Sequence, residues 1–506
     1  MTRFKQNRAV MVLGTSSGAG KSLFVAALCR IFSRKGIKVS PFKSQNMALN
    51  SFVTKTGGEI GRAQALQAMA AGIEPTVTMN PVLLKASGEK GIQVIINGKA
   101  EGHMSAKEYY SKRETLWRVV LDAIEGLRSE YELIVAEGAG SPAEINLNDV
   151  DIANMAVADA LDAPAVLVGD IEKGGVFASL YGTVLLARHR ERIKGFVINK
   201  FRGERGILTP GLSMIRELTG IPVLGVVPYL EGIGLPEEDG LHLKRGTMKM
   251  PDPGVGSVKV VIVHLPFISN FTDFDPLFLE VDTEVVYSTS PEVIKGADLV
   301  ILPGTKSTVR DLLFLRQMGI DEAVRHAAAE GREVLGICGG YQMLSERILD
   351  DGIESDQGEI EGLGLLEMET VFSGDKITRS VAGIVASEEF ATNCKPDTEL
   401  RGYEIHMGRS YGDASIFRLW NRDEKIRGDW YDGSRKGSVW GTYVHGIFDN
   451  DTFRRGYLNF VRQKKGLEPI ENSVSYHDEI ERAIDNLADR IEESIDIGML
   501  MRITGI

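Results

Sequence analysis

Cysteine is scarce in this sequence, and long apolar runs are missing from it. The three cysteines, Cys29, Cys338 and Cys394, are too few for a disulfide framework in a chain of 506 residues, and their number is odd. No apolar run approaches the roughly 18 residues of a membrane span, and the N-terminus lacks the apolar region of a secretory signal. We therefore expect a soluble cytoplasmic protein without a membrane partner.

Positive charge is also in the minority, with 58 Lys and Arg against 70 Asp and Glu and a net charge of −12. Such a chain has no general electrostatic attraction for nucleic acid, so anionic ligands need local sites. Glycine is abundant at 56 residues, which predicts many tight turns. The length of 506 residues favours two or three domains. The sequence carries no signal for the oligomeric state.

Short apolar runs alternate with Gly-rich turns and helical periodicity, which is typical of α/β domains with doubly wound parallel sheets. We predict one such domain over residues 1–228, an irregular linker over 229–257 and a second α/β domain over 258–465. The remaining segment, 466–506, has apolar residues at spacings of three and four, which predict an amphipathic helix packed on the second domain. These residues are Ile480, Ile484, Leu487, Ile491 and Ile495.

The string AVMVLGTSSGAGKS reads as an apolar strand, a Gly-rich turn and a helix that opens with Lys21 and Ser22. Backbone N–H groups of such a turn bind phosphate oxygens, the Lys meets the β- and γ-phosphates, and the hydroxyl binds Mg²⁺. A plain strand-to-helix turn is the alternative. The turn is one residue longer than the common phosphate loop, because Gly14 precedes Thr15. The predicted ATP-binding residues are Gly14, Thr15, Gly18, Gly20, Lys21 and Ser22.

Two charged residues fit the same site. Glu137 ends the apolar strand ELIVAE, where a carboxylate can bind Mg²⁺ together with Ser22. Lys43 follows the second strand and can neutralise charge that develops on the γ-phosphate. The longer loop resembles that of dethiobiotin synthetase and its ATPase relatives. This resemblance implies that Asn199 in VINKFRG contacts adenine, and it matches Pro228 to a similar segment unless Pro228 is an ordinary turn residue.

A second constellation lies in the C-terminal half. REVLGICGGYQML places Cys338 at a sharp strand-to-helix turn, which exposes a nucleophile at the edge of the sheet. His445, at the end of the apolar run GSVWGTYVHG, is available as the base that accepts the thiol proton. Backbone N–H groups near Gly304 and at Gly339 can form an oxyanion hole. Cys29 has no such setting and is expected in the core.

This set resembles a class I glutamine amidotransferase. The resemblance implies that glutamine is the ammonia donor and that its binding residues are Gly304, Thr305, Gly339, Tyr341, Gln342 and His406. Many members carry H-x-E, whereas Ile447 stands at the Glu position here. Either the Cys and His act as a dyad, or a carboxylate such as Asp449 or Glu404 completes a triad.

A longer series of strings resembles the cobyric acid synthase family of the cobalamin pathway. These strings are FKSQNMALNS, EIGRAQALQA, MNPVLLK, EGAGSPAEINL, GDIEKGGVFAS, INKFRG, ISNFTDFDPL, LPGTKST and GYEIHMG. The resemblance implies an ATP- and Mg²⁺-dependent enzyme that amidates the b, d, e and g carboxylates of adenosylcobyrinic acid a,c-diamide. It also implies that Gln45, Asn46 and Asp170, with residues 59–64, line the corrinoid or magnesium region.

Four alternatives to this family are considered. Cobyrinic acid a,c-diamide synthase, or a ligase acting on a cell-wall lipid intermediate, would share both domains. A partitioning ATPase usually has Lys where Ser16 stands here, and its second domain would be a degenerate binding module without Cys338 and His445. A stand-alone glutaminase leaves Lys21 and Glu137 without a role.

Overall fold

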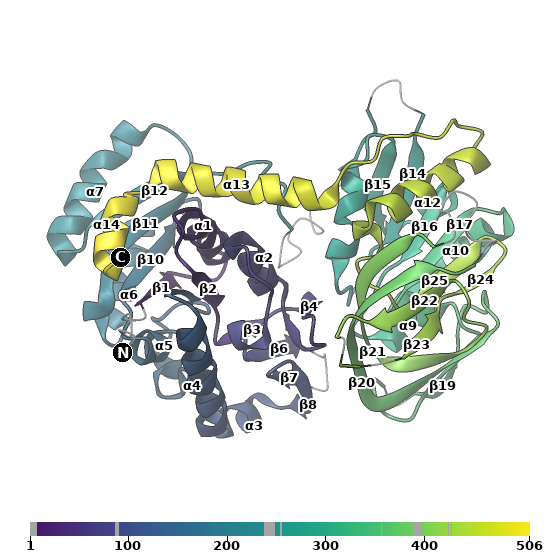
Figure 1. Ribbon diagram of the computed structural model, residues 1–506, viewed down its shortest axis with the longest axis horizontal. Helices are drawn as coiled ribbons and strands as arrows, with labels where there is room; N and C mark the ends of the chain where they lie inside the picture. The colour runs from purple at the N-terminus through teal and green to yellow at the C-terminus, as the bar shows by residue number, and fades with distance from the viewer. Residues whose placement is uncertain are drawn as a thin grey trace. The chain divides into compact units, whose positions relative to one another are not determined.

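The computed structural model describes residues 8–86, 91–236, 248–252, 256–355, 357–387, 397–423, 425–426 and 428–506. The chain divides into two compact units, each with its own sheets (Figure 1). The first unit comprises Met1–Ala48, Glu59–Leu235 and Ile480–Ile506, and the second comprises Leu49–Gly58 and Pro236–Glu479. The predicted linker, 229–257, lies partly outside the described residues, and Cys394 lies wholly outside them.

A six-stranded parallel sheet forms the centre of the first unit, in the order β12-β11-β10-β1-β9-β2. Its strands are continuous apolar runs buried on both faces, as is typical of parallel sheets. The strands are β1 (Arg8–Gly14), β2 (Val39–Phe42), β9 (Leu133–Glu137), β10 (Ala165–Asp170), β11 (Ile193–Phe201) and β12 (Val223–Pro228). The helices are α1 (Lys21–Arg34), α2 (Arg62–Ala71), α4 (Arg113–Glu130), α5 (Met155–Ala160), α6 (Val176–Leu186) and α7 (Arg205–Thr219).

A smaller four-stranded sheet, β3-β6-β7-β8, lies in the same unit. Its strands are β3 (Gln45–Met47), β6 (Val82–Ala86), β7 (Ile92–Ile96) and β8 (Lys99–Met104), followed by α3 (Ala106–Ser111). A short strand, β5 (Glu59–Gly61), leads into α2.

The C-terminal helix forms where the sequence predicts it, but the prediction that it packs on the second domain is wrong. The helices α13 (Tyr476–Ser494) and α14 (Ile497–Thr504) end the chain, and residues from Ile480 onward belong to the first unit (Figure 1). The reason is charge complementarity as well as burial. Acidic residues of α13 form ion pairs with α1: Arg30 with Glu481, Arg34 with Asp485 and Asp489, and Lys35 with Glu492.

The second unit is built on a seven-stranded sheet in the order β13-β15-β14-β16-β17-β25-β24. Its five central strands are parallel, and β13 and β24 are antiparallel at the edges. The strands are β13 (Met248–Lys249), β14 (Val258–Val263), β15 (Thr283–Ser288), β16 (Leu299–Leu302), β17 (Glu333–Ile337), β24 (Ser434–Lys436) and β25 (Val439–Thr442). The helices are α8 (Pro291–Lys295), α9 (Thr308–Gln317), α10 (Ile320–Ala329), α11 (Gly339–Met343) and α12 (Asp451–Lys464).

A second sheet of this unit consists of β18 (Arg347–Asp350), β19 (Gly358–Glu361), β20 (Met368–Val385), β21 (Glu399–Gly412), β22 (Phe417–Asn421) and β23 (Asp429–Asp432). The second unit also contains the strand β4 (Ser51–Val53) and the 3-10 turns η6 (Phe271–Phe278) and η7 (Ile447–Asp449).

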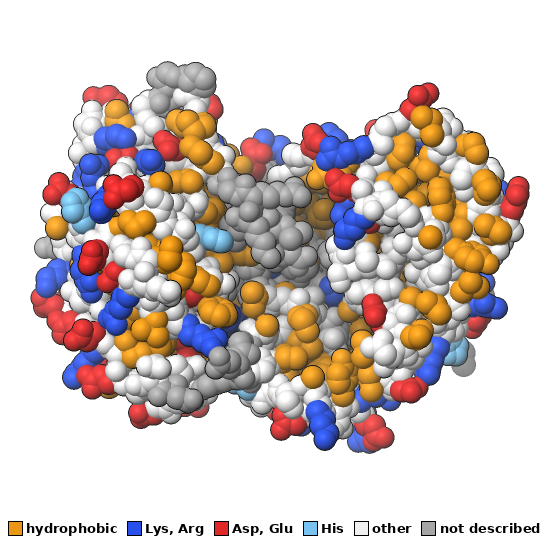
Figure 2. Space-filling model, turned by 180° about the vertical axis from the view of Figure 1, so that it is seen from behind, with side chains coloured by type: hydrophobic (Ala, Val, Ile, Leu, Met, Phe, Trp, Pro, Cys, Tyr) orange, Lys and Arg blue, Asp and Glu red, His pale blue; other side chains and the backbone are white. Residues whose placement is uncertain are grey.

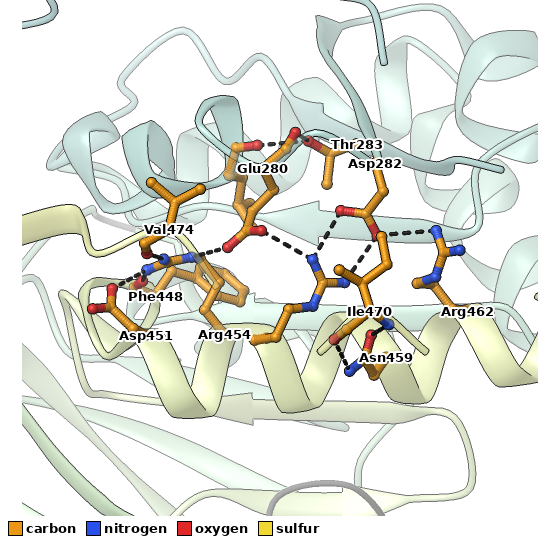
Figure 3. A network of polar contacts seen from close by, with 12 residues as sticks. Glu280, Asp282, Thr283, Phe448, Asp451, Arg454, Asn459, Arg462, Ile470 and Val474 are labelled. Atoms are coloured by element: carbon orange, nitrogen blue, oxygen red, sulfur yellow. Dashed lines mark hydrogen bonds and ion pairs between the residues drawn. The ribbon is translucent and has the colours of Figure 1, made fainter. Parts of the chain in front are cut away.

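A buried ionic network ties α12 to the segment between η6 and β15 (Figure 3). The fully buried Arg454 donates to Glu280 at 2.7 Å and to the carbonyl of Phe448 at 2.6 Å. Arg455 forms ion pairs with both Glu280 and Asp282 at 2.9 Å. Burial alone raises the pKa of Asp282, but the Arg455 and Arg462 guanidinium groups outweigh it, so that the pKa is lowered.

The visible surface carries mixed charge. On the face shown in Figure 2, Lys and Arg side chains lie interspersed with Asp and Glu side chains. Within the described part of the chain, no helix combines the length and apolar character that a membrane span requires.

Candidate active sites

The phosphate loop lies between β1 and α1 in the first unit. Lys21 is buried and donates to the carbonyls of Ser16 and Gly140, both at 3.0 Å. A Cβ on Gly14 would lie 2.8 Å from Lys21 Nζ, so a side chain at Gly14 would displace the ammonium. Gly18 and Gly20 both have positive φ, and the amide N–H of Thr15 donates to Val168 at 3.0 Å. The loop therefore places the Lys21 ammonium at one edge of the sheet, and its glycines adopt backbone conformations that other residues resist.

The Glu137 carboxylate is the centre of the polar cluster beside this loop. As predicted, Glu137 ends β9; Ser22 Oγ donates to it at 2.8 Å and Lys43 Nζ at 2.7 Å. Burial alone raises the pKa of Glu137, but the Lys43 ammonium and the hydrogen bonds outweigh it and the pKa is lowered. Glu137 is therefore ionised despite its burial, and an ionised carboxylate is a suitable ligand for a hard cation.

Gln67, on α2, belongs to the same cluster and was not predicted. Its Nε2 donates to Glu137 Oε2 at 2.6 Å and to the Ser22 carbonyl at 3.2 Å. Its Oε1 is buried and has no hydrogen-bond partner among the residues that the structure describes. The residue sits in the ordinary-looking helical string GRAQALQA, so sequence reasoning had only the presence of an amide to go on.

This donor set fits Mg²⁺. The cluster offers a hydroxyl, an ionised carboxylate and a buried amide oxygen, which are the hard oxygen donors that the ion prefers. No group of three or more His, Cys, Asp or Glu residues suited to a metal occurs within the described ranges. A single carboxylate suffices for Mg²⁺ when substrate phosphates supply further oxygens.

Asn199 and Lys200 contact the other side of the phosphate loop. Asn199 Nδ2 donates to the Ala19 carbonyl at 2.9 Å, and a Cβ on Gly20 would collide with this amide. Lys200, whose φ is 62°, donates to the Gly18 carbonyl at 2.7 Å and lies 3.0 Å from Asp170 Oδ2. Asp170 therefore lies near the loop, held by a lysine that sequence reasoning had passed over, whereas Pro228 ends β12 with an exposed side chain.

Gln45 and Asn46 lie on β3, in the smaller sheet. Tyr109 donates to Gln45 Oε1 at 2.6 Å, and Asn46 Nδ2 donates to Gln64 Oε1 at 2.9 Å. Gln64 lies one turn before Gln67 on α2, and its Nε2 lacks a described hydrogen-bond partner. Asn46 thus connects through α2 to the Glu137 cluster, whereas the Gln45 side chain contacts Tyr109 on α3.

In the second unit, Cys338 occupies a strained turn between β17 and α11, with φ 52° and ψ −108°. Its Sγ lies 3.5 Å from the Ile405 carbonyl. A side chain on Gly340 would collide with Leu302, which explains the second glycine after the cysteine. Cys29, in contrast, is fully buried in α1, and burial raises the pKa of its thiol well above the usual value.

The predicted oxyanion donors lie beside this cysteine. A Cβ on Gly304 would lie 3.8 Å from Cys338 Cβ and 3.0 Å from His445 Cε1. A Cβ on Gly339 would lie 3.1 Å from the backbone nitrogen of Thr305. The N–H of Gly339 opens α11, and the first N–H groups of a helix have no partner inside it. The backbone at Gly304 and Thr305 thus lies close to Cys338 and Gly339, as an oxyanion hole requires.

His445, the predicted base, is paired with Asp273 on η6 and with neither of the two carboxylates considered from the sequence. His445 Nδ1 lies 2.6 Å from Asp273 Oδ2, and the N–H of Gly446 donates to Asp273 Oδ1 at 3.1 Å. Burial alone lowers the pKa of His445, but the Asp273 carboxylate and the Cys338 sulfur outweigh it and raise the pKa to about 10. The only sequence signal was the Asp-rich string ISNFTDFDPL.

Glu404 and Asp449 have other positions. Trp430 Nε1 donates to Glu404 at 3.2 Å, and burial together with the Asp432 carboxylate raises the pKa of Glu404 to about 7. Asp449 ends η7 and lies beside Gly446, where a Cβ would be 3.2 Å from its Oδ2.

Gln342, Tyr341 and His406 surround Tyr443, a residue that was not singled out from the sequence. Thr308 donates to Gln342 Oε1 at 3.0 Å, and Gln342 Nε2 donates to Tyr443 at 3.3 Å. The ring of His406 stacks on Tyr443 with centroids 3.8 Å apart, and burial lowers the pKa of His406 to about 3. Tyr341 hydroxyl bonds Ser434 at 2.7 Å. His406 is therefore neutral and packed.

The second site can thus carry out nucleophilic acyl chemistry, because a thiol, an imidazole with an orienting carboxylate and the backbone of Gly304, Thr305 and Gly339 lie close together. The first site can bind a nucleoside triphosphate, because a phosphate loop, two lysines and a cluster of oxygen donors lie together.

Comparisons with known proteins agree with this division. Residues 10–243 match the CobQ/CobB/MinD/ParA nucleotide binding domain, and residues 259–453 match the CobB/CobQ-like glutamine amidotransferase domain.

Several curated relatives are similar over almost the whole chain. A cobyric acid synthase of Thermodesulfovibrio yellowstonii is 48% identical over 504 residues, which cover 99% of this chain and 100% of the relative. The cobyric acid synthase of Photorhabdus laumondii is 47% identical over 97% of this chain and 96% of the relative. The cobyric acid synthase of Clostridium botulinum is 46% identical over 98% of this chain and 99% of the relative.

Proposed function

Because this chain belongs to the cobyric acid synthase family and is a glutamine-hydrolysing amidoligase of cobalamin biosynthesis, we propose that it amidates the b, d, e and g carboxylates of adenosylcobyrinic acid a,c-diamide. One observation carries the proposal: the Cys338, His445 and Asp273 site and the Glu137 cluster behind the phosphate loop occur in one chain. We place the enzyme in the cytoplasm, where a catalytic thiol stays reduced.

In the glutaminase unit, His445 accepts the proton of Cys338, and the thiolate attacks the side-chain amide carbon of glutamine. The N–H groups of Gly339 and Thr305 donate to the oxygen that gains negative charge. His445 then returns the proton to the leaving nitrogen, which departs as ammonia and leaves a thioester. Water hydrolyses the thioester to glutamate and restores the thiol. Asp273 keeps the imidazole oriented throughout.

In the synthetase unit, a corrinoid carboxylate attacks the γ-phosphorus of ATP, which gives an acyl phosphate and ADP. Lys21 and Lys43 stabilise the charge that builds up on the transferred group. Ser22 and Glu137 would hold Mg²⁺, which would supply positive charge beside the phosphates, and Gln67 would orient Glu137. Ammonia attacks the acyl carbon, and phosphate leaves with the formation of the amide. Asn199 supports the loop, and Gln45, Asn46 and Asp170 are the corrinoid-side candidates.

Mass spectrometry of adenosylcobyrinic acid a,c-diamide, incubated with the protein, glutamine, ATP and Mg²⁺, tests this proposal. Each acid-to-amide conversion replaces a hydroxyl by an amino group and shifts the mass by a fixed increment. We expect one shift for each of the four carboxylates. An unchanged mass, with glutamine hydrolysed and ATP consumed on another acid, would overturn the substrate assignment.

Two variants separate the half-reactions. Cys338→Ala should lose glutamine-dependent amidation and keep activity with ammonium chloride, because the synthetase site is intact. Lys21→Ala should lose both, because neither nitrogen source can replace activation of the carboxylate. Ammonia-driven activity in Lys21→Ala at the wild-type rate would overturn the phosphate-loop assignment.

A further inference from the structure

The segment Leu49–Gly58 belongs to the second unit, although its neighbours in sequence on both sides belong to the first. Ser51 and Val53 are each 1% exposed, and Asn50 is fully buried. A peptide that buries polar and apolar side chains to this degree is part of a packed wall, because surface loops keep such groups in water. The elements that pack against it are therefore informative.

Those elements form the wall of the glutaminase site. Val53 shares a small buried cluster with Tyr403 and Ile405, and Ile405 is the residue whose carbonyl faces Cys338 Sγ. The ring of Phe52 lies 6.3 Å from that of Tyr403. The hydroxyl of Tyr403 donates to the backbone carbonyl of Ser51 at 3.4 Å.

The backbone N–H of Ser51 makes the second connection, to Asn270. This N–H donates to Asn270 Oδ1 at 3.0 Å. Because the amide oxygen is held by this bond, the amide N–H₂ group of Asn270 points away from Ser51. Asn270 Nδ2 lies 3.5 Å from His445 Nε2. The residue has φ 52°, a left-handed conformation that Asn tolerates better than most side chains.

His445 is consequently held on three sides. Its ring stacks on Tyr403 with centroids 5.1 Å apart and 16° between the planes, and its Nδ1 is held by Asp273. An amide N–H₂ that faces Nε2 favours the tautomer with its proton on Nδ1, so that Nε2 can accept the proton of Cys338. Ser51 supplies the hydrogen bonds that set two of these three neighbours.

We propose that Leu49–Gly58 is a positioning element of the glutaminase, in which the backbone of Ser51 holds Asn270 and Tyr403 so that these orient His445 toward Cys338. The inference rests on the proposed glutaminase role of the second unit. It assigns to a stretch of the N-terminal half of the sequence a part in a reaction carried out by residues of the C-terminal half.

The test compares Asn270→Gly, which keeps the left-handed backbone and removes the amide, with Tyr403→Phe, which keeps the stacked ring and removes the bond to Ser51. Lys55→Ala, an exposed position in the same segment, is the matched control. For Asn270→Gly we expect the glutaminase kcat to fall by up to about 10²-fold, the loss typical of a reacting group displaced by about 1 Å. KM and ammonia-driven amidation should change little, and Lys55→Ala should match the wild type. Asn270→Asp, which keeps the bond from Ser51 and replaces the donor, should not restore kcat.

A second readout needs no substrate. The rate at which iodoacetamide labels Cys338, followed by peptide mass spectrometry across pH, reports the His445–Cys338 pair. Urea unfolding reports the stability of the second unit, and labelling of the buried Cys29 reports opening of the first unit. We expect the pH profile of Cys338 to shift in Asn270→Gly and Tyr403→Phe and to stay unchanged in Lys55→Ala. An unaltered profile would overturn the positioning role. So would a lowered urea midpoint together with a fall in glutamine- and ammonia-driven rates in equal proportion. If the wild type hydrolyses no glutamine, the proposed function fails, and the labelling profile still decides the positioning question.

Discussion

Asp273 Oδ2 lies 2.6 Å from His445 Nδ1, although 172 residues of sequence separate the two side chains. The contact joins the η6 turn to the residue that follows β25, and it buries an acid and a base together. An oriented imidazole of this kind is what thiol activation requires.

Asp273→Asn should cut glutamine-dependent amidation by about 10²- to 10⁴-fold, because the amide can stabilise the wrong tautomer of His445 and offers no charge to the imidazolium. The ammonia-driven rate should stay near that of the wild type. Steady-state rates with each nitrogen source check this, with Asp449→Asn as the control. Wild-type glutaminase in Asp273→Asn would show that the pair has no catalytic role.

The stability of the second unit should depend on pH through His445. Its pKa is raised to about 10 in the folded chain, above the roughly 6.5 expected when unfolded. The stabilisation is thus fully present below about pH 6.5 and is lost as pH rises toward 10. Urea unfolding of wild type and His445→Gln at several pH values should give a free-energy difference that shrinks over this window. A difference that grows with pH would contradict the assignment.

Gln67→Leu should weaken use of Mg²⁺ in the synthetase reaction, because Glu137 loses a 2.6 Å hydrogen bond and the site loses an amide oxygen. We expect the Mg²⁺ concentration for half-maximal rate to rise by about 10- to 100-fold, as for other residues that orient metal ligands. Glutamine- and ammonia-driven amidation should suffer equally, and glutamine hydrolysis alone should not. Met69→Leu, on the same helix, serves as the control, and an unchanged Mg²⁺ requirement in Gln67→Leu would refute the role.

Arg454→Met should destabilise the second unit by about 3–5 kcal/mol, because it leaves Glu280 with one partner fewer in a buried network. It also removes the bond to Phe448, which follows His445 by three residues, so glutaminase activity should fall as well. Urea unfolding measures the first effect. Arg347→Ala, which breaks the exposed pair with Glu369, should leave the unfolding midpoint unchanged. Equal midpoints for the two variants would mean that the network adds nothing.

Local patterns carried the sequence-based predictions that succeeded. The strand-turn-helix strings around Lys21 and Cys338 specify their own geometry, because glycines permit turns that other residues resist. The place of His445 at the end of an apolar run predicted a position near Cys338, and both residues lie beside Gly304. Both α/β units, with their parallel sheets, followed from apolar runs that alternate with helical periodicity.

The residues that were missed depend on tertiary proximity. Asp273 stands among other acidic residues, and nothing in its neighbours points to His445. Gln67 has an ordinary helical context, and nothing in Leu49–Gly58 points to a place in the second unit. For α13, the apolar stripe predicted that one face of the helix is buried. It did not predict which unit covers that face, since any apolar surface can do so. Its acidic residues opposite the basic end of α1 were the signal that could have decided the question.

The C-terminal helices also bear on how the chain is made. Ile495 bridges to Gly225 on β12, and the amide of Asp496 donates to the Leu224 carbonyl. A ribosome finishes β12 long before it reaches these residues, so the first unit emerges with its α1 and β12 surfaces uncovered while the whole second unit is synthesised. Domains otherwise close in order from the N-terminus. Here the unit whose synthesis begins first is completed last, because its C-terminal helices are made last. A nonsense codon in α13 would therefore leave the core of the second unit intact and remove part of the packing of the first unit.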